Sequence, residues 1–137
     1  MSSALVGTWS LNSFYRLDAT GERFDYAELR GLLTYAADGC MQVLICEQRP
    51  GLAGRYLTTD EKAAIFDTMT AYAGTYTVTG STVIHHVKLS WNQTWGGGDQ
   101  VRHFELVGDT LKIRTPEIGE VATGRPVGTY VLEWLRR

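Results

Sequence analysis

Two adjacent histidines, His85 and His86, are the residues of this sequence whose chemistry most directly suggests a function. Imidazole is the side chain whose charge changes near neutral pH, and it is also the commonest metal ligand in proteins. A third histidine, His103, follows later in the chain. The pair raises two questions: whether both rings bind one metal ion, and whether either ring handles a proton on a ligand. Both answers depend on the element that carries them.

Residues 82–91 read TVIHHVKLSW, a run rich in β-branched and aromatic residues that predicts a β-strand. Neighbouring side chains of a strand point to opposite faces, so His85 and His86 cannot bind one ion together. By the same alternation His103 faces away from the apolar side of its own segment. We therefore expect no metal site and no cofactor. The face of His85 is apolar, because it also carries Val83, Val87, Leu89 and Trp91.

The rest of the chain is predicted to be mostly strands as well. Eight are expected, at residues 7–17, 31–37, 40–48, 73–79, 82–91, 101–107, 110–116 and 128–137. One segment, residues 58–74, predicts a helix instead, with Thr59 or Asp60 as its N-cap and Gly74 at its end. We find no linker or repeat, so a single domain over residues 1–137 is expected.

The lengths of the connections predict the architecture. Asp38-Gly39, Gly80-Ser81 and Gly108-Asp109 are short turns typical of tight hairpins. The four connections between them are long, and one contains the helix. In an up-and-down meander the short turns then lie at one end and the long loops at the other. Eight antiparallel strands close naturally into a barrel, so we predict an all-β, eight-stranded up-and-down antiparallel barrel. Its helix lies between strands three and four, near the mouth, as a lid. A β-sandwich with Greek-key crossings is the alternative.

The register set by the short turns selects candidate residues for chemistry. Across Gly80-Ser81, Tyr76 lies opposite His85 on the inner face, and across Gly108-Asp109 the inner face includes Arg102. We take His85, Tyr76 and Arg102 as candidate catalytic groups, because a desolvated imidazole beside a phenol and a guanidinium could move a proton or stabilise an oxyanion. The structural alternatives are a core histidine hydrogen-bonded to Tyr76 and an arginine solvated at the mouth.

The same alternation gives the residues expected to contact a ligand. Strand 7–17 contributes Trp9 and Tyr15, and the glycine-rich loop 92–99 contributes Trp95 as a flap. The inner faces of the other strands complete the predicted ligand-binding set: Met41, Val43, Val87, Leu89, Trp91, Phe104 and Tyr130, with Thr34 and Ile45 pointing the same way.

Composition limits the partners and the compartment. The formal net charge is −2 and no basic stripe stands out, so we expect no nucleic-acid partner. No apolar run is long enough for a membrane span, and the first residues lack the features of a signal peptide, so we expect a cytoplasmic protein without membrane contact. Cys40 and Cys46 would lie about 20 Å apart on one strand, too far for a disulfide.

Several stretches resemble a known family. Val6-Gly7-Thr8-Trp9 resembles the Gly-x-Trp signature of lipocalins and related calycins. LTYAADGCMQV, AYAGTYTV, HHV and QVRHFEL resemble the lipocalin-like domain proteins of bacteria and fungi. The resemblance implies a barrel whose floor is closed by Trp9, with Arg136 from the last strand packed over it. It implies no particular ligand, because function belongs to the site and not to the fold.

Three functions follow from a barrel of this kind. The first is binding of a small, mostly apolar or aromatic metabolite. The second is a cofactor-independent isomerase, cyclase or hydro-lyase that acts on a polyketide-like or terpenoid-like intermediate in the same cavity. The third is a homodimer that uses an outer face with His86 and Tyr35. No nucleophile triad, phosphate loop or nicotinamide-binding motif is present in the sequence.

Overall fold

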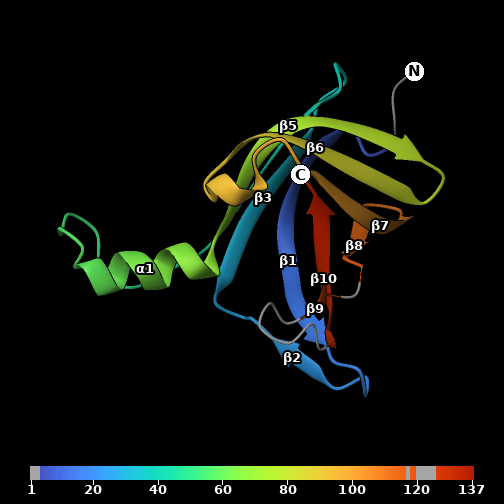
Figure 1. Ribbon diagram of the computed structural model, residues 1–137. Coiled ribbons are helices and arrows are strands. Elements are labelled where there is room, and N and C mark those ends of the chain that lie inside the picture. Colours follow the sequence, from blue (N-terminus) through green and yellow to red (C-terminus); the bar gives the residue numbers. More distant parts are fainter. Residues whose placement is uncertain (1–3, 117, 120–125) are drawn as a thin grey trace.

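The computed structural model describes residues 4–116, 118–119 and 126–137, and β-strands make up most of this part (Figure 1). It contains one α-helix, α1 (Thr59–Thr68), and one short 3-10 helix, η1 (Gln93–Trp95). The strands are β1 (Gly7–Leu17), β2 (Arg23–Asp25), β3 (Leu29–Tyr35), β4 (Cys40–Glu47), β5 (Thr70–Thr79), β6 (Thr82–Ser90), β7 (Asp99–Val107), β8 (Thr110–Arg114), β9 (Ile118–Gly119) and β10 (Pro126–Arg136).

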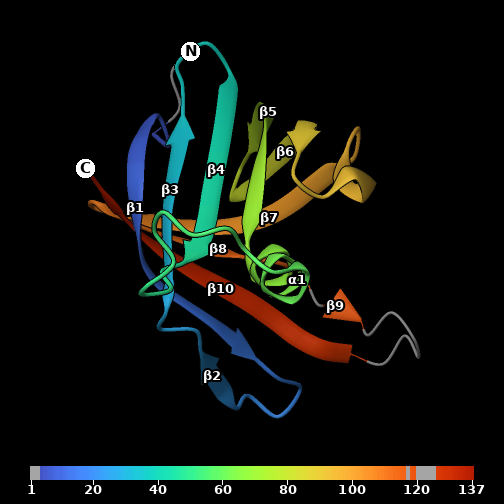
Figure 2. The same ribbon diagram turned by 90° about the vertical axis from the view of Figure 1, so that its left-hand side faces the viewer.

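Eight of these strands form one antiparallel sheet that closes on itself. Their order is β1, β3, β4, β5, β6, β7, β8 and β10, and β10 pairs back with β1. The short β2 and β9 only extend the ends of β1 and β10. Figure 2 shows β1, β3 and β4 side by side in the wall, with β10 crossing beside them. The predicted eight-stranded up-and-down antiparallel barrel is confirmed.

The short turns gather at one end of the barrel, as expected. Backbone hydrogen bonds join each turn to the strand beyond it: Tyr76 donates to Gly39, Phe104 to Ser81 and Arg136 to Asp109. Gly39, Gly80 and Gly108 have φ angles of 92°, 58° and 59°, which only glycine adopts easily. The glycines in these turns therefore allow the strands to reverse tightly, and they close one end of the barrel.

A tryptophan and an arginine seal this closed end, the floor. Trp9 is fully buried, and its indole Nε1 donates to the carbonyl oxygen of Leu5 over 3.0 Å. The guanidinium of Arg136 lies 4.3 Å from the centre of the Trp9 ring and donates to the carbonyl oxygens of Val6 and Ala4. The contact predicted from the family resemblance is therefore present.

The helix α1 lies between β4 and β5, which are the third and fourth barrel strands once the short β2 is set aside. Thr58 caps it, and the Thr58 side chain and Glu61 bond to each other's backbone N–H groups. The helix ends at Thr68, six residues before the expected Gly74, and none of its side chains is buried. It projects sideways from the barrel in Figure 1 and is seen end-on in Figure 2. Only its last residues, Phe66 to Thr68, border the cavity, so α1 lies at the rim but does not close the mouth as the expected lid.

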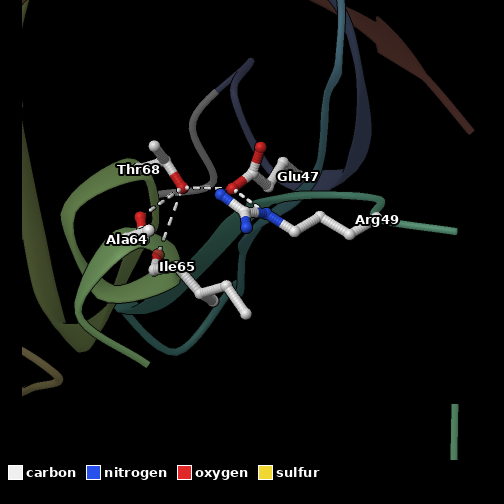
Figure 3. Close-up of polar contacts among 5 residues, drawn as sticks. All are labelled: Glu47, Arg49, Ala64, Ile65 and Thr68. Carbon is white, nitrogen blue, oxygen red and sulfur yellow. Dashed lines mark hydrogen bonds and ion pairs between the residues drawn. The ribbon is translucent and has the colours of Figure 1, made fainter. Parts of the chain in front are cut away.

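Only the last turn of α1 is tied to the barrel, through a small polar network (Figure 3). The Thr68 hydroxyl lies 3.1 Å from Glu47 Oε1, and 3.3 and 3.2 Å from the carbonyl oxygens of Ala64 and Ile65. Arg49 Nε donates to the same Glu47 oxygen over 2.7 Å. Glu47 ends β4, so this network fixes the C-terminal end of α1 beside the long-loop end of the barrel.

A β-bulge between β5 and β6 changes which side chains face inward. Gly74 pairs with Val87 as predicted, but Ala73 pairs with Leu89, so one residue of β6 is extra. A Cβ at Gly74 would collide with the carbonyl oxygen of His86, so this position needs glycine. Beyond the bulge the alternation is reversed. Leu89 is 72% exposed, and the prediction that it points inward was wrong.

A second bulge, between Leu11 and Ser13 of β1, has the same effect on Tyr15. Phe14 faces the cavity instead. Tyr15 points outward, where the guanidinium of Arg23 covers its ring at 3.7 Å from the ring centre. The prediction that Tyr15 faces the barrel interior was therefore wrong.

The turn between β3 and β4 is one residue longer than the two-residue turn that the sequence suggested. Ala36 donates to Cys40, and Tyr35 pairs with Met41, so three residues form the loop. Three-residue loops with a glycine at the last position are common in hairpins. The extra residue brings Tyr35 to the inner face and Thr34 to the outer face. Tyr35 is fully buried, which contradicts its predicted place at an outer dimer interface.

Candidate functional site

The barrel holds a cavity of about 450 Å³ at its long-loop end, within the size range of small-molecule sites. Strands from both sides of the barrel contribute to its walls, and the end of α1 and the η1 loop form its rim. Most wall side chains are apolar, among them Leu33, Val43, Ile45, Ile113, Leu132 and Trp134.

His85 is the polar residue most deeply placed in this wall, with 3% of its surface exposed. Its Nε2 lies 2.6 Å from the hydroxyl of Tyr35 on β3, and its Nδ1 lies 2.5 Å from the hydroxyl of Tyr72 on β5. The two phenol rings and the imidazole thus form one hydrogen-bonded chain across the barrel interior. Both ring nitrogens of His85 are engaged by the protein itself.

The environment keeps this histidine neutral. Burial lowers the pKa of His85 to about 3, and the charge of Arg102 and the neighbouring His86 act in the same direction. A neutral imidazole carries one N–H donor and one acceptor nitrogen. With one tyrosine at each nitrogen, His85 has no free nitrogen for a ligand, so direct proton transfer from His85 is disfavoured.

The two tyrosines are held neutral by the same burial. Desolvation raises the pKa of Tyr72 to about 12, although the charge of Arg102 and hydrogen bonding with it partly offset the rise. Desolvation, with a smaller effect of Tyr72, raises the pKa of Tyr35 well above its usual value. Tyr72 lines the cavity and Tyr35 lies behind it, so only Tyr72 can reach a ligand.

Arg102 brings a positive charge to the same wall. Its Nη1 donates to the carbonyl oxygen of Val101 over 2.9 Å, and its Nη2 donates to Gln100 Oε1 over 3.1 Å. Neither partner carries a negative charge. In the part of the chain that the structure describes, no carboxylate forms an ion pair with Arg102. The guanidinium therefore faces the cavity as an uncompensated cation.

Aromatic side chains surround the mouth. Trp91 lies between Trp95 and Phe66, with ring centres 4.9 and 5.8 Å away, and its Nε1 donates to the Phe66 carbonyl oxygen. Trp95 also approaches Tyr72, at 6.0 Å between ring centres. The end of α1 and the η1 loop are thereby linked over the cavity entrance.

On the opposite side of the cavity, Phe14, Tyr26 and Tyr130 form a second aromatic group. Tyr26 and Tyr130 lie 5.5 and 5.8 Å from Phe14, and 6.2 Å from each other, between ring centres. Two carboxylates, Glu28 and Asp67, also line the cavity near its rim. The rim thus carries negative groups, whereas the inner wall carries Arg102.

His86 lies on the outer wall in a different chain of contacts. Its Nε2 lies 2.8 Å from the Thr77 hydroxyl, and its Nδ1 lies 2.9 Å from Asp99 Oδ1. The order of atoms is that of a hydrolase triad. However, Thr77 is exposed on the outer wall, and none of the three residues lines the cavity. The contacts act as cross-strand links.

Within the described ranges, no group of three or more His, Cys, Asp or Glu side chains is arranged to hold a metal ion. Nor do these ranges contain a helix with the length and apolar character needed to span a bilayer. Cys40 and Cys46 are both free thiols.

A family comparison decides the identity of the domain. The sequence model that describes the lipocalin-like domain matches residues 6–137, almost the whole chain. The chain belongs to the lipocalin-like domain family. The resemblance that the Gly7-Thr8-Trp9 stretch and the later motifs suggested is thereby confirmed.

Other comparisons add less about this lipocalin-like domain. A crystal structure of an uncharacterized protein from Bacteroides eggerthii DSM 20697 is similar to it, with 14% sequence identity over 96% of this chain and 98% of that chain. The TM-score is 0.44, which is too low to support any argument about function. No curated protein matches the sequence.

The lipocalin-like cavity brings together six of the predicted site residues: His85, Arg102, Val43, Trp91, Trp95 and Tyr130. Tyr76 is paired with His85 as predicted, but its hydroxyl donates to the Ala36 carbonyl oxygen and does not line the cavity. Four others pack in the core of the barrel away from the cavity: Trp9, Met41, Val87 and Phe104.

The sequence missed both tyrosines that hold His85. Tyr72 was included in the predicted helix, because Gly74 resembled a helix C-terminus. Tyr35 was assigned to the outer face through a turn taken as one residue too short. One signal was available for Tyr72: the run TAYAGTYTVT contains threonine and tyrosine from its start, residue types enriched in strands, which favours a strand that begins before Gly74.

Proposed function

We propose that this lipocalin-like domain binds a small, mostly apolar or aromatic molecule inside its barrel. The observation that supports this function is the cavity of about 450 Å³, whose walls are mostly apolar and whose entrance is lined by Phe66, Trp91 and Trp95. Aromatic side chains bury large areas and pack well against planar ligands. Because association itself costs several kcal/mol, we expect affinities in the micromolar range for a ligand of two fused rings.

Uptake of N-phenyl-1-naphthylamine tests the proposal, because this neutral dye fluoresces strongly only in apolar surroundings. The wild-type protein should give a saturable rise in emission. Leu132→Trp, which fills the cavity from β10, should weaken binding at least ~10-fold, the loss expected when a ligand and a large side chain compete for one space. The matched control is Leu135→Trp on the same strand, because Leu135 is 42% exposed on the outer side.

The outcomes separate clearly. Equal uptake by wild type, Leu132→Trp and Leu135→Trp would place the dye outside the cavity and contradict the proposal, as would an absence of uptake. If Leu132→Trp loses the far-UV spectrum of the barrel, Phe14→Trp fills the cavity from the neighbouring strand β1 and replaces it.

A second candidate is a cofactor-independent isomerase, cyclase or hydro-lyase for a polyketide-like or terpenoid-like intermediate. One observation favours it: Tyr72 and Arg102 lie on one wall, where they can stabilise a developing oxyanion. Enolisation of a bound ketone is the simplest reaction of this kind: a water molecule takes the α-proton while Tyr72 and Arg102 stabilise the enolate oxygen. Deuterium exchange into the methyl group of 2-acetylnaphthalene in D₂O, followed by NMR, should exceed the solvent rate if this candidate is correct. Exchange at the solvent rate would contradict this candidate and leave ligand binding as the only proposed function.

We propose the cytoplasm as the site of this function. The support is chemical: Cys40 is exposed and Cys46 is half-buried, and both are free. Free, accessible thiols persist in reducing compartments. Tagging the protein in its host and separating cell fractions tests the compartment.

A further inference from the structure

We propose that the ligand carries an oxygen acceptor, a carbonyl or a carboxylate, which accepts hydrogen bonds from the Tyr72 hydroxyl and the Arg102 guanidinium. His85 is a positioning residue that orients the Tyr72 hydroxyl toward the ligand. This inference rests on the proposed binding function and adds the chemical class of the ligand.

The Tyr35 hydroxyl decides the tautomer of His85. Tyr35 is fully buried, and His85 Nε2 is the only hydrogen-bond partner of its hydroxyl among the described residues. If His85 Nε2 carried the proton, it would donate to Tyr35, and the Tyr35 hydrogen would have no acceptor. A buried donor without an acceptor is unfavourable, because it has lost its hydrogen bond to water. Tyr35 therefore donates to Nε2, and the ring proton of His85 lies on Nδ1.

The tautomer then decides the role of Tyr72. His85 Nδ1 donates to the Tyr72 hydroxyl oxygen at 2.5 Å, so the Tyr72 hydrogen is not used in this contact. The charge of Arg102 and its hydrogen bonding act on the same hydroxyl. Arginine has only donors, so Tyr72 cannot donate to it. Tyr72 lines the cavity, and its hydrogen is free for an acceptor on the ligand.

The Arg102 guanidinium also lacks an acceptor that matches its charge. Its hydrogen-bond partners among the described residues are neutral: the Val101 carbonyl, the Gln100 amide and the Tyr72 hydroxyl. A partly buried cation without a counter-charge is costly, and an oxygen acceptor on the ligand reduces that cost.

Trp134 on β10 also has an indole N–H without a partner among the described residues, although this nitrogen is itself buried. The residue is 1% exposed and lines the cavity. The inner wall therefore presents donors without matching acceptors. At the rim the balance is opposite, because Glu28 and Asp67 line the cavity there. A ligand with one oxygen head thus places that head inside, against Arg102, and its apolar body toward the aromatic mouth.

Displacement of N-phenyl-1-naphthylamine by three naphthalenes of similar size tests the inference. The three are 2-isopropylnaphthalene, without an acceptor; 2-acetylnaphthalene, with a neutral carbonyl; and 2-naphthoate, with a carboxylate. We expect the two oxygen-bearing compounds to displace the dye at concentrations about 10-fold lower, the preference that a hydrogen bond to a charged group gives. A further gain for 2-naphthoate identifies a carboxylate ligand; equal or better displacement by 2-acetylnaphthalene identifies a carbonyl ligand.

Each outcome bears on one of the two proposals. If 2-isopropylnaphthalene displaces the dye as well as the others do, or if none of the three displaces it, the inference is wrong and the binding function stands. If the dye itself does not enter the cavity, the binding function fails and the inference fails with it.

Variants locate the donors. Tyr72→Phe and Arg102→Met should each reduce the preference of 2-acetylnaphthalene over 2-isopropylnaphthalene to about 3-fold or less, mainly by weakening the binding of 2-acetylnaphthalene. The matched control is Tyr76→Phe, which removes a hydroxyl that donates to Ala36 and lies outside the cavity. It should keep the full preference. If both test variants keep it as well, the assignment of the donors is wrong.

His85→Phe tests the positioning role. It removes the Nδ1–H that fixes the Tyr72 hydroxyl, so part of the preference should be lost while 2-isopropylnaphthalene still binds normally. A merely structural role would lower the affinity for both compounds alike, and an unchanged preference would also contradict the positioning role. If His85→Phe does not fold, His85→Gln keeps a hydrogen-bonding amide near Tyr72 and should restore folding with an intermediate preference.

Discussion

Trp9 at the floor and Trp134 in the cavity wall are almost equally buried, at 0% and 1% exposure, but their indole N–H groups differ. Trp9 Nε1 donates to the Leu5 carbonyl oxygen, and Arg136 packs over the ring. Trp134 Nε1 has no partner in the described part of the chain. The floor supplies its own acceptors, whereas the cavity wall leaves donors unused.

This difference separates stability from function within one barrel. Buried polar groups in proteins are normally hydrogen-bonded, so an unpaired donor in a wall is a reason to expect a partner from outside. At the floor, changes should alter the free energy of unfolding. In the cavity wall, changes that keep the shape should alter ligand preference more than stability.

The largest effect should come from the floor. Trp9→Ala should lower the free energy of unfolding by about 3–5 kcal/mol, because it removes a fully buried aromatic ring and leaves a hole. Trp95→Ala at the mouth, where the ring is only half-buried, should lower it by less than about 1.5 kcal/mol. Urea unfolding curves measure both. A loss below about 1 kcal/mol for Trp9→Ala would show that the ring is not part of the core.

The cavity wall should make stability depend on pH. His85 has a pKa of about 3 in the folded protein and near 6.5 when unfolded, so the unfolded chain binds one more proton between these values. The stabilisation is complete above pH 6.5 and declines as the pH falls toward 3. The free energy of unfolding should therefore drop by about 1.4 kcal/mol per pH unit from this group.

Urea unfolding at pH 7.0, 6.0 and 5.0 measures this slope, in a range above most carboxylate titrations. In His85→Phe the slope should be much smaller. Ile45→Val provides the control, since it weakens the core without changing a titratable group and should keep the wild-type slope. Parallel slopes for wild type and His85→Phe would mean that His85 is protonated as easily in the folded protein as in the unfolded chain.

An arginine at the floor should contribute more to the free energy of unfolding than a similar arginine on the outer surface. Arg136→Met removes a cation from above Trp9 together with two hydrogen bonds to carbonyl oxygens, so a loss of about 2 kcal/mol is expected. Arg23 also lies over a ring, that of Tyr15, but its side chain is 49% exposed. Arg23→Met should cost less than about 1 kcal/mol. Equal losses would remove the distinction between floor and surface.

The smallest effect is spectroscopic. Addition of 1-dodecanol, which neither absorbs nor emits in the tryptophan range, should shift the emission of the wild-type protein if Trp95 moves over the cavity as a flap. Trp95→Phe should remove more of this shift than Trp9→Phe, because Trp9 lies at the floor away from the cavity. If the two variants respond alike while displacement assays show that 1-dodecanol binds, Trp95 does not act as a flap.

The sequence was sufficient to predict the barrel and the register of the hairpin that carries His85. The pairs Val78–Val83, Tyr76–His85 and Gly74–Val87 are those that a two-residue turn at Gly80-Ser81 requires. Local turn geometry fixes such pairs, so they can be predicted by counting residues outward from the turn. The floor could be anticipated as well, because the Gly-x-Trp resemblance names both Trp9 and its arginine.

The rest of the site depends on single inserted residues that the sequence pattern does not show. The bulge at Gly74 moves Leu89 outward, the bulge in β1 replaces Tyr15 with Phe14, and one extra loop residue brings Tyr35 inside. Each insertion reverses the alternation beyond it. The neighbouring strand decides whether an insertion is present, and a strand read alone does not contain that information.

The seam between β1 and β10 has a consequence for how fast the barrel forms. Arg136 reaches the carbonyl oxygen of Val6 across 130 residues of sequence, and Trp9 pairs with Arg136 in the same seam. Joining such distant segments requires the loss of much chain entropy before any contact there is gained. Barrels with so many non-local pairings refold in milliseconds to seconds. Until the seam closes, β1 and β10 both expose unpaired strand edges, so this interval is when the chain is most prone to aggregate.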